Sequence, residues 1–387
     1  MTPGAPRDPA PMLADIRRQP ECLARLLARA DEFGAIGRRA LVPGPGGCLY
    51  AVASGDGWFA ARAVSRAARR GLGLPWRATS ALPFLAYDAP HLTQADRVVV
   101  ISMSGDVDRT NEAWLAARAR GAPGLVLTNG RGGRLAEAAA LTVSLDIQAL
   151  APFLCGTSTY TGTVLALTLL LLGASARDAT DARPVDPAWR PTPAAIGAAL
   201  GRLPELLVDA DRAATEIAER AARPGAPSTP GVRILGAGPH LATAEYGVAK
   251  LVELTRVPSW SDDVEEFAHR QFWSADPGNL IVYLVPNAVL AARTTDAAAA
   301  LAEMGFETWA LESGGHPAPT ATRRLALPAT PEWLAALLLP VPLQLLAYRL
   351  ARATGLDPDT RTHLRDDCAR FRVSRLLTRR ALVDTGR

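Results

Sequence analysis

The sequence predicts an α/β protein made of two tandem doubly wound parallel sheets with flanking helices. Short, continuously apolar runs alternate with helix-length segments, the pattern of parallel strands that are buried on both faces. Glycine and serine gather where these runs end, which places the ligand crevice there. The pattern also occurs twice. Gly55-Asp56-Gly57 recurs 181 positions later as Gly236-Ala237-Gly238, and Val100 and Leu284, each near the end of a second strand, are 184 positions apart.

Composition supports a folded chain of about two domains. The 387 residues are 49% hydrophobic and 21% charged, enough to bury a large core and to exclude wholesale disorder. The net charge of +4 is spread among carboxylates, and its densest run is the tail from Arg370 to Arg380. We find no basic stripe with interleaved aromatic residues, so no nucleic-acid partner is expected. Lys250 is the single lysine among 42 basic residues, so it is the one internal amine available for a Schiff base.

Cysteine usage and hydropathy indicate a soluble, cytoplasmic protein. The four cysteines are far apart and form no CxxC pair, which favours a reducing compartment and disfavours a zinc site or disulfides. Residues 1–12 are proline-rich and lack the apolar core of a signal peptide. The apolar run 164–174 is too short to span a bilayer, and prolines break the run 334–348. We expect no membrane partner, no metal and no cofactor.

The first half of the chain is predicted to hold three strands, each followed by a polar turn and, after the first two, a helix. A helical lead with apolar positions three or four residues apart precedes them. The expected elements are helix 13–40, strand 48–52, helix 59–70, strand 97–101, helix 110–120 and strand 124–127.

The second half repeats the pattern after two proline-rich segments, a surface connection at 175–195 and a joint at 223–230. The expected elements are strand 232–235, helix 242–254, strand 280–285, helix 294–304 and strand 308–311. This predicts a helical lead 1–44, a first domain 45–174, a linker with a helix 175–230, a second domain 231–330 and C-terminal helices with a tail 331–387.

The loop from Ser102 to Thr110 is the first candidate site. Its hydroxyls and free backbone N–H groups lie between a buried strand and a helix N-terminus, where the helix dipole favours an anion. With Ser54 and Gly55 on the neighbouring strand end, it forms a plausible phosphate cradle. Capping of the helix by Ser104, Asp106 or Thr110 is the commoner explanation of such residues. Asp56, Asp106 and Asp108 also count against an anion-selective pocket.

Two further segments carry chemistry. The turn at Gly236 is weak evidence for a dinucleotide site, because no acidic residue is clearly placed downstream of it. Lys250 and Glu253 follow on one helical face, where a surface salt bridge is the plain alternative. The acidic segment 261–270 ends in His269 and Arg270. A carboxylate beside histidine suits proton shuttling at sugar carbons. With one histidine and no cysteine, metal ligation is disfavoured, and a solvated acidic loop is the alternative.

Together these motifs resemble the two-domain SIS (sugar isomerase) family, in particular the isomerase half of glucosamine-6-phosphate synthase and its amino-sugar deaminase and deglycase relatives. Ser102-Met103-Ser104-Gly105 followed by Thr110 is similar to the family's phosphosugar loop. Ala249-Lys250-Leu251-Val252-Glu253 and Glu266-Phe267-Ala268-His269 are similar to segments of its second half. The resemblance covers about residues 45–365.

The resemblance implies roles for individual residues. Glu253 would be the base that shuttles a proton between C1 and C2, and His269 the acid/base for ring opening. Because such groups often meet across a dimer interface in this family, at least a homodimer with its site near the interface is implied. The residues implied in substrate binding are Ser54, Gly55, Asp56, Gly57, Ser102, Met103, Ser104, Thr110 and Glu266.

Several positions depart from the family pattern. Asp56 and Gly57 replace a threonine and a serine of the synthase loop, and Val107 replaces a threonine. These changes remove phosphate donors, and a desolvated Asp56 would disfavour a dianion by about 1–3 kcal/mol. The catalytic lysine near the C-terminus is missing, with 364–367 standing near its place. Either the substrate end differs or the site has degraded.

The sequence therefore predicts an enzyme acting on a sugar or amino sugar, with a phosphorylated one favoured. The reaction would be aldose–ketose isomerisation, or amine release by deamination or deglycation. The missing tail lysine favours a deaminase- or deglycase-like protein over a synthase. The alternative is a non-catalytic sugar-phosphate-binding or regulatory protein. A DNA-binding regulator would need a helix-turn-helix, for which residues 1–45 are too short.

Overall fold

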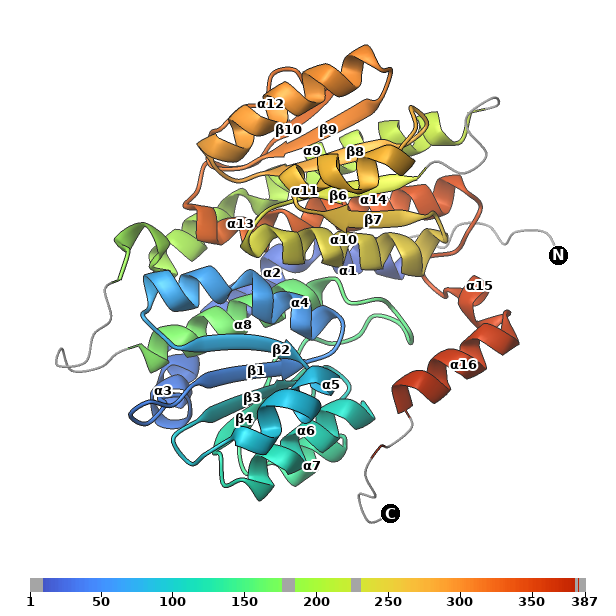
Figure 1. Ribbon diagram of the computed structural model, residues 1–387. Helices are drawn as coiled ribbons and strands as arrows, with labels where there is room; N and C mark the ends of the chain where they lie inside the picture. Colours follow the sequence, from blue (N-terminus) through green and yellow to red (C-terminus); the bar gives the residue numbers. More distant parts are fainter. Residues whose placement is uncertain (1–9, 176–184, 224–230, 380–381, 383–387) are drawn as a thin grey trace.

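The protein contains two five-stranded parallel sheets, one in each half of the chain (Figure 1). The computed structural model describes residues 10–175, 185–223, 231–379 and 382. The strand orders are β2-β1-β3-β4-β5 and β10-β9-β8-β6-β7, and every pairing within them is parallel. The predicted fold class, two tandem doubly wound parallel sheets with flanking helices, is confirmed.

Each half holds five strands, not the three predicted. The strands are β1 (Leu49–Ala53), β2 (Trp76–Ser80), β3 (Arg97–Ile101), β4 (Gly124–Thr128), β5 (Thr142–Ser144), β6 (Val232–Leu235), β7 (Ser259–Asp262), β8 (Leu280–Val285), β9 (Glu307–Glu312) and β10 (Arg323–Ala326). All six predicted strands are inner strands, and the four missed ones, β2, β5, β7 and β10, are edges. Inner strands are buried on both faces and so read as apolar runs, whereas the edge strands carry polar residues.

Helices cover both faces of the two sheets (Figure 1). Those of the first half are α4 (Asp56–Ala63), its π-helical continuation η1 (Ala67–Gly71), α5 (Ala81–Pro83), α6 (Asp108–Ala119), α7 (Arg134–Ala138) and α8 (Ser158–Ala174). Those that follow are α9 (Pro193–Ala221), α10 (Pro239–Thr255), α11 (Val264–His269), α12 (Ala288–Glu303), α13 (Ala335–Leu338), α14 (Pro340–Ala353), α15 (Thr362–Arg365) and α16 (Cys368–Arg379).

The N-terminal lead is three helices, so the prediction of one helix over 13–40 is wrong. They are α1 (Pro11–Arg17), α2 (Gln19–Leu27) and α3 (Ala30–Ala40). Pro20 lies in the first turn of α2, where its missing N–H costs no hydrogen bond, and it could not continue α1. In α3, a Cβ at Gly37 would lie 1.9 Å from the Leu170 carbonyl oxygen, so this glycine lets α3 and α8 pack backbone to backbone.

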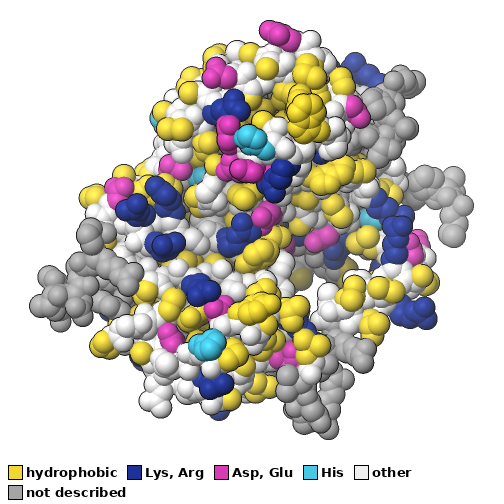
Figure 2. Space-filling view, viewed as in Figure 1, with side chains coloured by type: hydrophobic (Ala, Val, Ile, Leu, Met, Phe, Trp, Pro, Cys, Tyr) yellow, Lys and Arg dark blue, Asp and Glu magenta, His cyan; other side chains and the backbone are white. Residues whose placement is uncertain are grey.

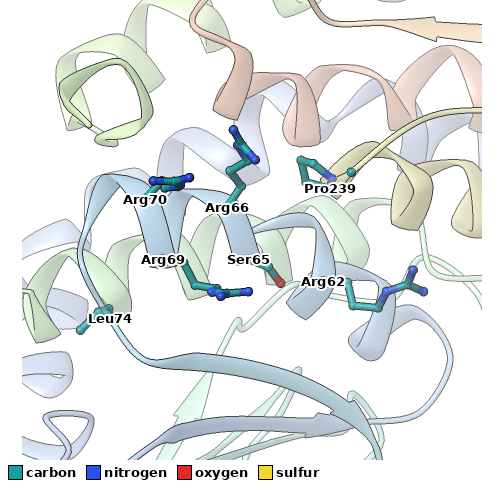
Figure 3. A pocket seen from close by; sticks show the side chains of 8 residues that line it. Arg62, Ser65, Arg66, Arg69, Arg70, Leu74 and Pro239 are labelled. Carbon is teal, nitrogen blue, oxygen red and sulfur yellow. The ribbon is translucent and has the colours of Figure 1, made fainter. Parts of the chain in front are cut away.

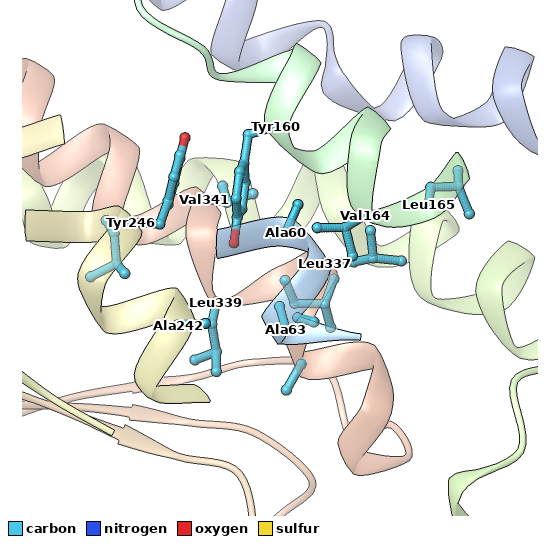
Figure 4. Close-up of a cluster of buried hydrophobic side chains, with 14 of the residues drawn as sticks. Ala60, Ala63, Tyr160, Val164, Leu165, Ala242, Tyr246, Leu337, Leu339 and Val341 are labelled. Atoms are coloured by element: carbon cyan, nitrogen blue, oxygen red, sulfur yellow. The ribbon is translucent and has the colours of Figure 1, made fainter. Parts of the chain in front are cut away.

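The junction between the halves is built on α4, α8, α10 and α14. The rings of Tyr160 and Tyr246 stack there with centroids 3.6 Å apart, among aliphatic side chains from all four helices and α13 (Figure 4). Tyr246 Oη donates to the Gly156 carbonyl oxygen at 2.7 Å and accepts from Gln344 Nε2 at 2.9 Å. The junction fixes α4 and α10 against each other, and the candidate site described below lies between these two helices.

The segment Glu332–Ala353 is long and apolar enough to cross a membrane, yet 94% of its apolar window is buried inside the protein. It contains α13 and α14, and α14 packs against α9 and α10. It is a core element, which explains its composition without a bilayer; no other helix in the described ranges meets the same criteria.

Part of the predicted surface connection at 175–195 belongs to regular elements: α9 begins at Pro193, and Trp189 is buried. The rest of that connection (176–184), most of the predicted joint at 223–230, the first nine residues and the end of the tail lie outside the described residues. The predicted domain boundaries stay predictions.

Candidate functional site

A cavity of about 620 Å³ opens at the carboxyl ends of β1 and β3, between the first turn of α4 and the last turns of α10. Parallel pairing brings these strand ends together: Ala53 lies opposite Ile101 in the register. The predicted site residues that line the cavity are Ser54, Gly55, Asp56, Gly57, Ser102, Met103, Ser104, Thr110 and Glu253. Residues nearly 200 positions apart are therefore brought to one site.

Backbone geometry explains both glycines of the first strand-end turn. Gly55 is the N-cap of α4 with φ +55°, a conformation that favours glycine. At Gly57, a Cβ would lie 3.0 Å from Ala53 Cβ and from Ile101 Cγ2, so a larger residue would crowd the strand ends. Asp56, between them, is the first residue of α4 and carries the one charge of this turn.

The Ser102 loop offers one uncommitted hydroxyl. Ser102 is only 7% exposed, and its Oγ has no hydrogen-bond partner within the described ranges, so a ligand can satisfy it. Thr110 Oγ1 donates to the Val107 carbonyl oxygen at 2.7 Å, and Ser104 Oγ accepts from the Asp106 N–H at 3.3 Å. Val107 itself is the N-cap of α6 and makes no side-chain cap. The capping interpretation of this loop is therefore wrong.

The acidic residues of the same loop lie away from the cavity. Asp106 and Asp108 do not line it; Asp108 Oδ1 accepts from Arg134 Nη2 at 2.7 Å, and Asp106 Oδ1 accepts from the Arg134 N–H at 3.3 Å. Of the three carboxylates that counted against an anion, Asp56 alone lines the cavity.

Lys250 and Asp56 form an ion pair beside the cavity, in which the lysine is buried and the aspartate is partly exposed. Lys250 is 1% exposed, and its Nζ lies 2.9 Å from Asp56 Oδ2 and 3.2 Å from Glu253 Oε2. The interpretation of Lys250 and Glu253 as a surface salt bridge is therefore wrong. Burial alone would lower the pKa of Lys250, but the two carboxylates outweigh it and raise the pKa above its ordinary value. Lys250 is thus a charged positioning group.

Glu253 is held at the cavity by two cations. Its Oε2 accepts from Lys250 Nζ at 3.2 Å and from Arg361 Nη1 at 3.5 Å. Its Oε1 has no hydrogen-bond partner among the described residues, and the side chain is 36% exposed. One carboxylate oxygen is therefore fixed while the other is available to a ligand.

Glu266 and His269 are not brought to the cavity of the same chain. Both lie on α11, and both side chains are exposed. Asp263 caps this helix by accepting from the Glu265 N–H at 2.9 Å, and Arg270 pairs with Asp262 and, at 3.7 Å, with Glu266. The roles of Glu266 and His269 stay predictions.

Sequence reasoning missed several residues at or beside the cavity, among them Arg361, Gly156 and Cys155. Arg361 comes from the C-terminal loop, has φ +50° and also donates to the Phe153 carbonyl oxygen. Gly156 lies so close to the ion pair that its Cβ would be 2.4 Å from Asp56 Oδ2. Cys155 lines the cavity, and burial raises the pKa of its thiol to about 12, so it is an inert thiol. No local signal distinguishes Arg361 from the other 40 arginines.

No family model matches the sequence. A curated relative, glutamine–fructose-6-phosphate aminotransferase [isomerizing] from Gloeobacter violaceus, is 27% identical over 322 residues. The match covers 80% of this chain and 50% of the relative, so the chain spans about half the length of that protein.

Two solved structures share the fold. The C-terminal domain of glucosamine-fructose-6-phosphate aminotransferase from Francisella tularensis has a TM-score of 0.72 at 19% identity, covering 91% of this chain and 99% of that one. Glucosamine-6-phosphate deaminase from Thermotoga maritima has a TM-score of 0.70 at 16% identity, covering 90% and 96%. The two five-stranded parallel domains are thus matched together, and the chain is a two-domain protein of the SIS (sugar isomerase) fold.

Proposed function

We propose that this protein is an enzyme that transfers a proton between C1 and C2 of a sugar or amino sugar, with Glu253 as the base. The observation that carries the proposal is the placement of Glu253: Lys250 and Arg361 hold one carboxylate oxygen, and the other is free at a cavity lined by Ser102 and Ser104. The Glu253 carboxylate takes a proton from one carbon of the open-chain substrate. An enediol or enolamine forms, and the proton is returned to the neighbouring carbon.

The Ser102 loop is the proposed anchor for the far end of the substrate. Its uncommitted Ser102 Oγ and the first turns of α4 and α6 supply donors at the cavity. Asp56 opposes a phosphate less than an isolated carboxylate would, because Lys250 Nζ lies 2.9 Å from it. A phosphorylated substrate therefore remains the first choice, and fructose 6-phosphate and glucosamine 6-phosphate, which appear in the relatives' names, head the panel.

His269 is proposed to open the sugar ring from a second copy of the chain. This part of the proposal rests on the family resemblance and on two facts: His269 is exposed and lies outside its own cavity. Near it, Trp273 is 81% exposed, an apolar surface that a partner could cover. The proposed assembly is a homodimer.

Hydrogen exchange at the substrate tests the chemistry. The chain is incubated in heavy water with sugar phosphates, free sugars, amino-sugar phosphates and fructosamines, and loss of the C1 or C2 proton is followed by NMR. Glu253→Gln is expected to abolish exchange, whereas Glu205→Gln, at an exposed surface pair, leaves it intact. Exchange that persists in Glu253→Gln would exclude Glu253 as the base.

Mixed dimers test the role of His269. Glu253→Gln and His269→Asn chains are each expected to be inactive. Co-expressed at equal levels, they should regain about a quarter of the wild-type rate, because half the dimers are hybrids with one complete site. No recovery, with dimers present, would show that His269 does not act across the interface.

A non-catalytic sugar-phosphate-binding or regulatory protein is the second candidate. Asp56 and Val107 favour it, since both line the cavity at positions where the resemblance calls for donors. Binding of a sugar phosphate without any hydrogen exchange across the panel would support this candidate over the enzyme.

A further inference from the structure

The two halves of the chain are related by a pseudo-twofold axis that passes between α4 and α10. Gly55 (φ 55°, ψ −128°) and Gly238 (φ 56°, ψ −125°) are the N-caps of these helices and have the same backbone conformation. Their strands also correspond, since β1 lies between β2 and β3 and β6 lies between β7 and β8. The structure therefore pairs Gly55 with Gly238, an offset of 183 positions. The glycine motifs alone pair Gly55 with Gly236, an offset of 181 positions.

The side chains between the helices fit this axis. Arg62 of α4 forms an ion pair with Glu245 of α10, and these two residues are themselves 183 positions apart. Each is thus the counterpart of the other, as expected for a pair on the axis. Asp56 at the start of α4 meets Lys250 near the end of α10, so the two helices run antiparallel.

This symmetry places a second cavity opposite the candidate site. The start of α4 and the end of α10 form the candidate site, so the start of α10 and the end of α4 should form its counterpart. A cavity of about 680 Å³ lies there, lined by Gly238, Pro239, Arg62, Arg66, Arg69 and Arg70 among others. Figure 3 shows the four arginines along α4 and its continuation η1, with Pro239 across from them.

The two cavities carry side chains of opposite charge at the position of the proposed base. At the offset of 183, Arg66, Arg69 and Arg70 correspond to Ala249, Val252 and Glu253. The position of the proposed base is therefore occupied by a cation, and none of the described residues that line this cavity is acidic. Those residues include no carboxylate that could take a proton from a sugar carbon.

Three of the arginines are available to a ligand. Arg62 is neutralised by Glu245, but Arg66, Arg69 and Arg70 have no carboxylate partner within the described ranges. Arg66 is held by stacking on Trp189, with its guanidinium carbon 5.0 Å from the ring centroid. Two carboxylates lie close to these elements. Asp186 caps η5 (Pro187–Trp189) by accepting from the Ala188 N–H, and Glu332 lies 3.4 Å from His240 Nε2.

Helix α10 adds to the positive potential. Its 17 residues begin at Pro239, and its N-terminal dipole favours an anion. Guanidinium groups bind phosphate oxygens in pairs, with better geometry than an ammonium provides. Figure 2 shows basic side chains gathered on the face over α4, below the second domain.

From this geometry we infer a second, non-catalytic ligand site at the Arg66–Arg69–Arg70 cavity, which binds a small molecule through a phosphate monoester group. The inference does not depend on the proposed function, because it rests on charge and pseudo-symmetry rather than on Glu253.

Binding of inorganic phosphate and of glucose 6-phosphate to the full chain, measured by calorimetry, tests the inference. The variant Arg66→Gln/Arg69→Gln/Arg70→Gln is expected to bind inorganic phosphate at least about tenfold more weakly than wild type. The matched control, Arg25→Gln/Arg202→Gln/Arg212→Gln, removes three exposed arginines elsewhere and should leave binding unchanged. Unaltered binding in the first variant, or equal loss in the control, would overturn the inference.

Two further measurements separate this site from the candidate active site and from misfolding. The substitution Arg66→Lys/Arg69→Lys/Arg70→Lys keeps the charge and should retain part of the affinity, whereas a merely unfolded variant would not. Glucose 6-phosphate should bind the Arg66 site as tightly in Ser102→Ala as in the wild type. Hydrogen exchange at the sugar substrate by Arg66→Gln/Arg69→Gln/Arg70→Gln should stay at the wild-type rate. Loss of phosphate binding in Ser102→Ala alone would place the anion at the first cavity and refute the second site.

Discussion

Lys250 Nζ lies 2.9 Å from Asp56 Oδ2, so the single lysine of the chain, itself buried, joins the two domains by an ion pair. The two residues are 194 positions apart, and Lys250 also meets Glu253 at 3.2 Å. A buried ammonium between two carboxylates fixes the start of α4 against the end of α10. The candidate base is thereby oriented by the same contact that holds the domains together.

Asp56→Asn should destabilise the protein by about 1–3 kcal/mol, because Lys250 stays buried with one carboxylate in place of two. Urea unfolding at neutral pH measures the change. Asp209→Asn, at the exposed pair with Arg212, is the matched control and should shift the unfolding free energy by less than about 0.5 kcal/mol. Equal effects of the two substitutions would show that burial of the Lys250 pair contributes nothing.

Lys250 should remain an ammonium at pH values where free lysine loses its proton. Its pKa is raised, so the pair's stabilisation is complete below the ordinary lysine pKa and is lost as pH rises through the folded-state pKa. Selective 15Nζ-lysine labelling gives one side-chain resonance in this chain, which makes the titration unambiguous. The same sample in concentrated urea supplies the unfolded reference, near pH 10.4. A folded midpoint at or below that reference would contradict the ion pair.

Gly156→Ala should separate Asp56 from Lys250. The new Cβ would lie 2.4 Å from Asp56 Oδ2, so the carboxylate must move, at a cost of about 1–3 kcal/mol. Gly201→Ala is the matched control, since nothing lies within 4 Å of its Cβ and helix α9 should gain up to about 1 kcal/mol. In a double-mutant cycle with Asp56→Asn, the Gly156→Ala cost should shrink. Full additivity would indicate that the clash is relieved elsewhere.

Tyr246→Phe should cost about 1–3 kcal/mol of unfolding free energy. It leaves the partly buried Gly156 carbonyl oxygen and the buried Gln344 Nε2 without the hydroxyl that lies 2.7 and 2.9 Å from them. Tyr87→Phe, at a side chain that is 75% exposed, is the control and should be neutral. A neutral Tyr246→Phe would mean that this hydroxyl is not part of what locks α10 to α14.

Sequence patterns located the inner strands because burial on both faces demands apolar runs such as Leu280–Val285. They missed edge strands such as β7, where three of the four residues are polar and three are at least partly exposed. An edge strand is defined by its neighbour and not by its own hydropathy. The expected soluble, cytoplasmic location stays a prediction.

The sequence by itself determined the strand-end residues of the site. Ser54 and Ser102 directly follow neighbouring parallel strands, and parallel strands present their carboxyl ends at one edge, so local pattern was sufficient. Only the tertiary structure decided that Lys250 is buried against Asp56, that Arg361 holds Glu253, and that Arg70 takes the counterpart position of Glu253 across the pseudo-twofold axis. The two contacts join helices and loops far apart in the chain, and the correspondence relates helices in different halves. They depend on how α4 and α10 pack, which no periodicity within either helix encodes.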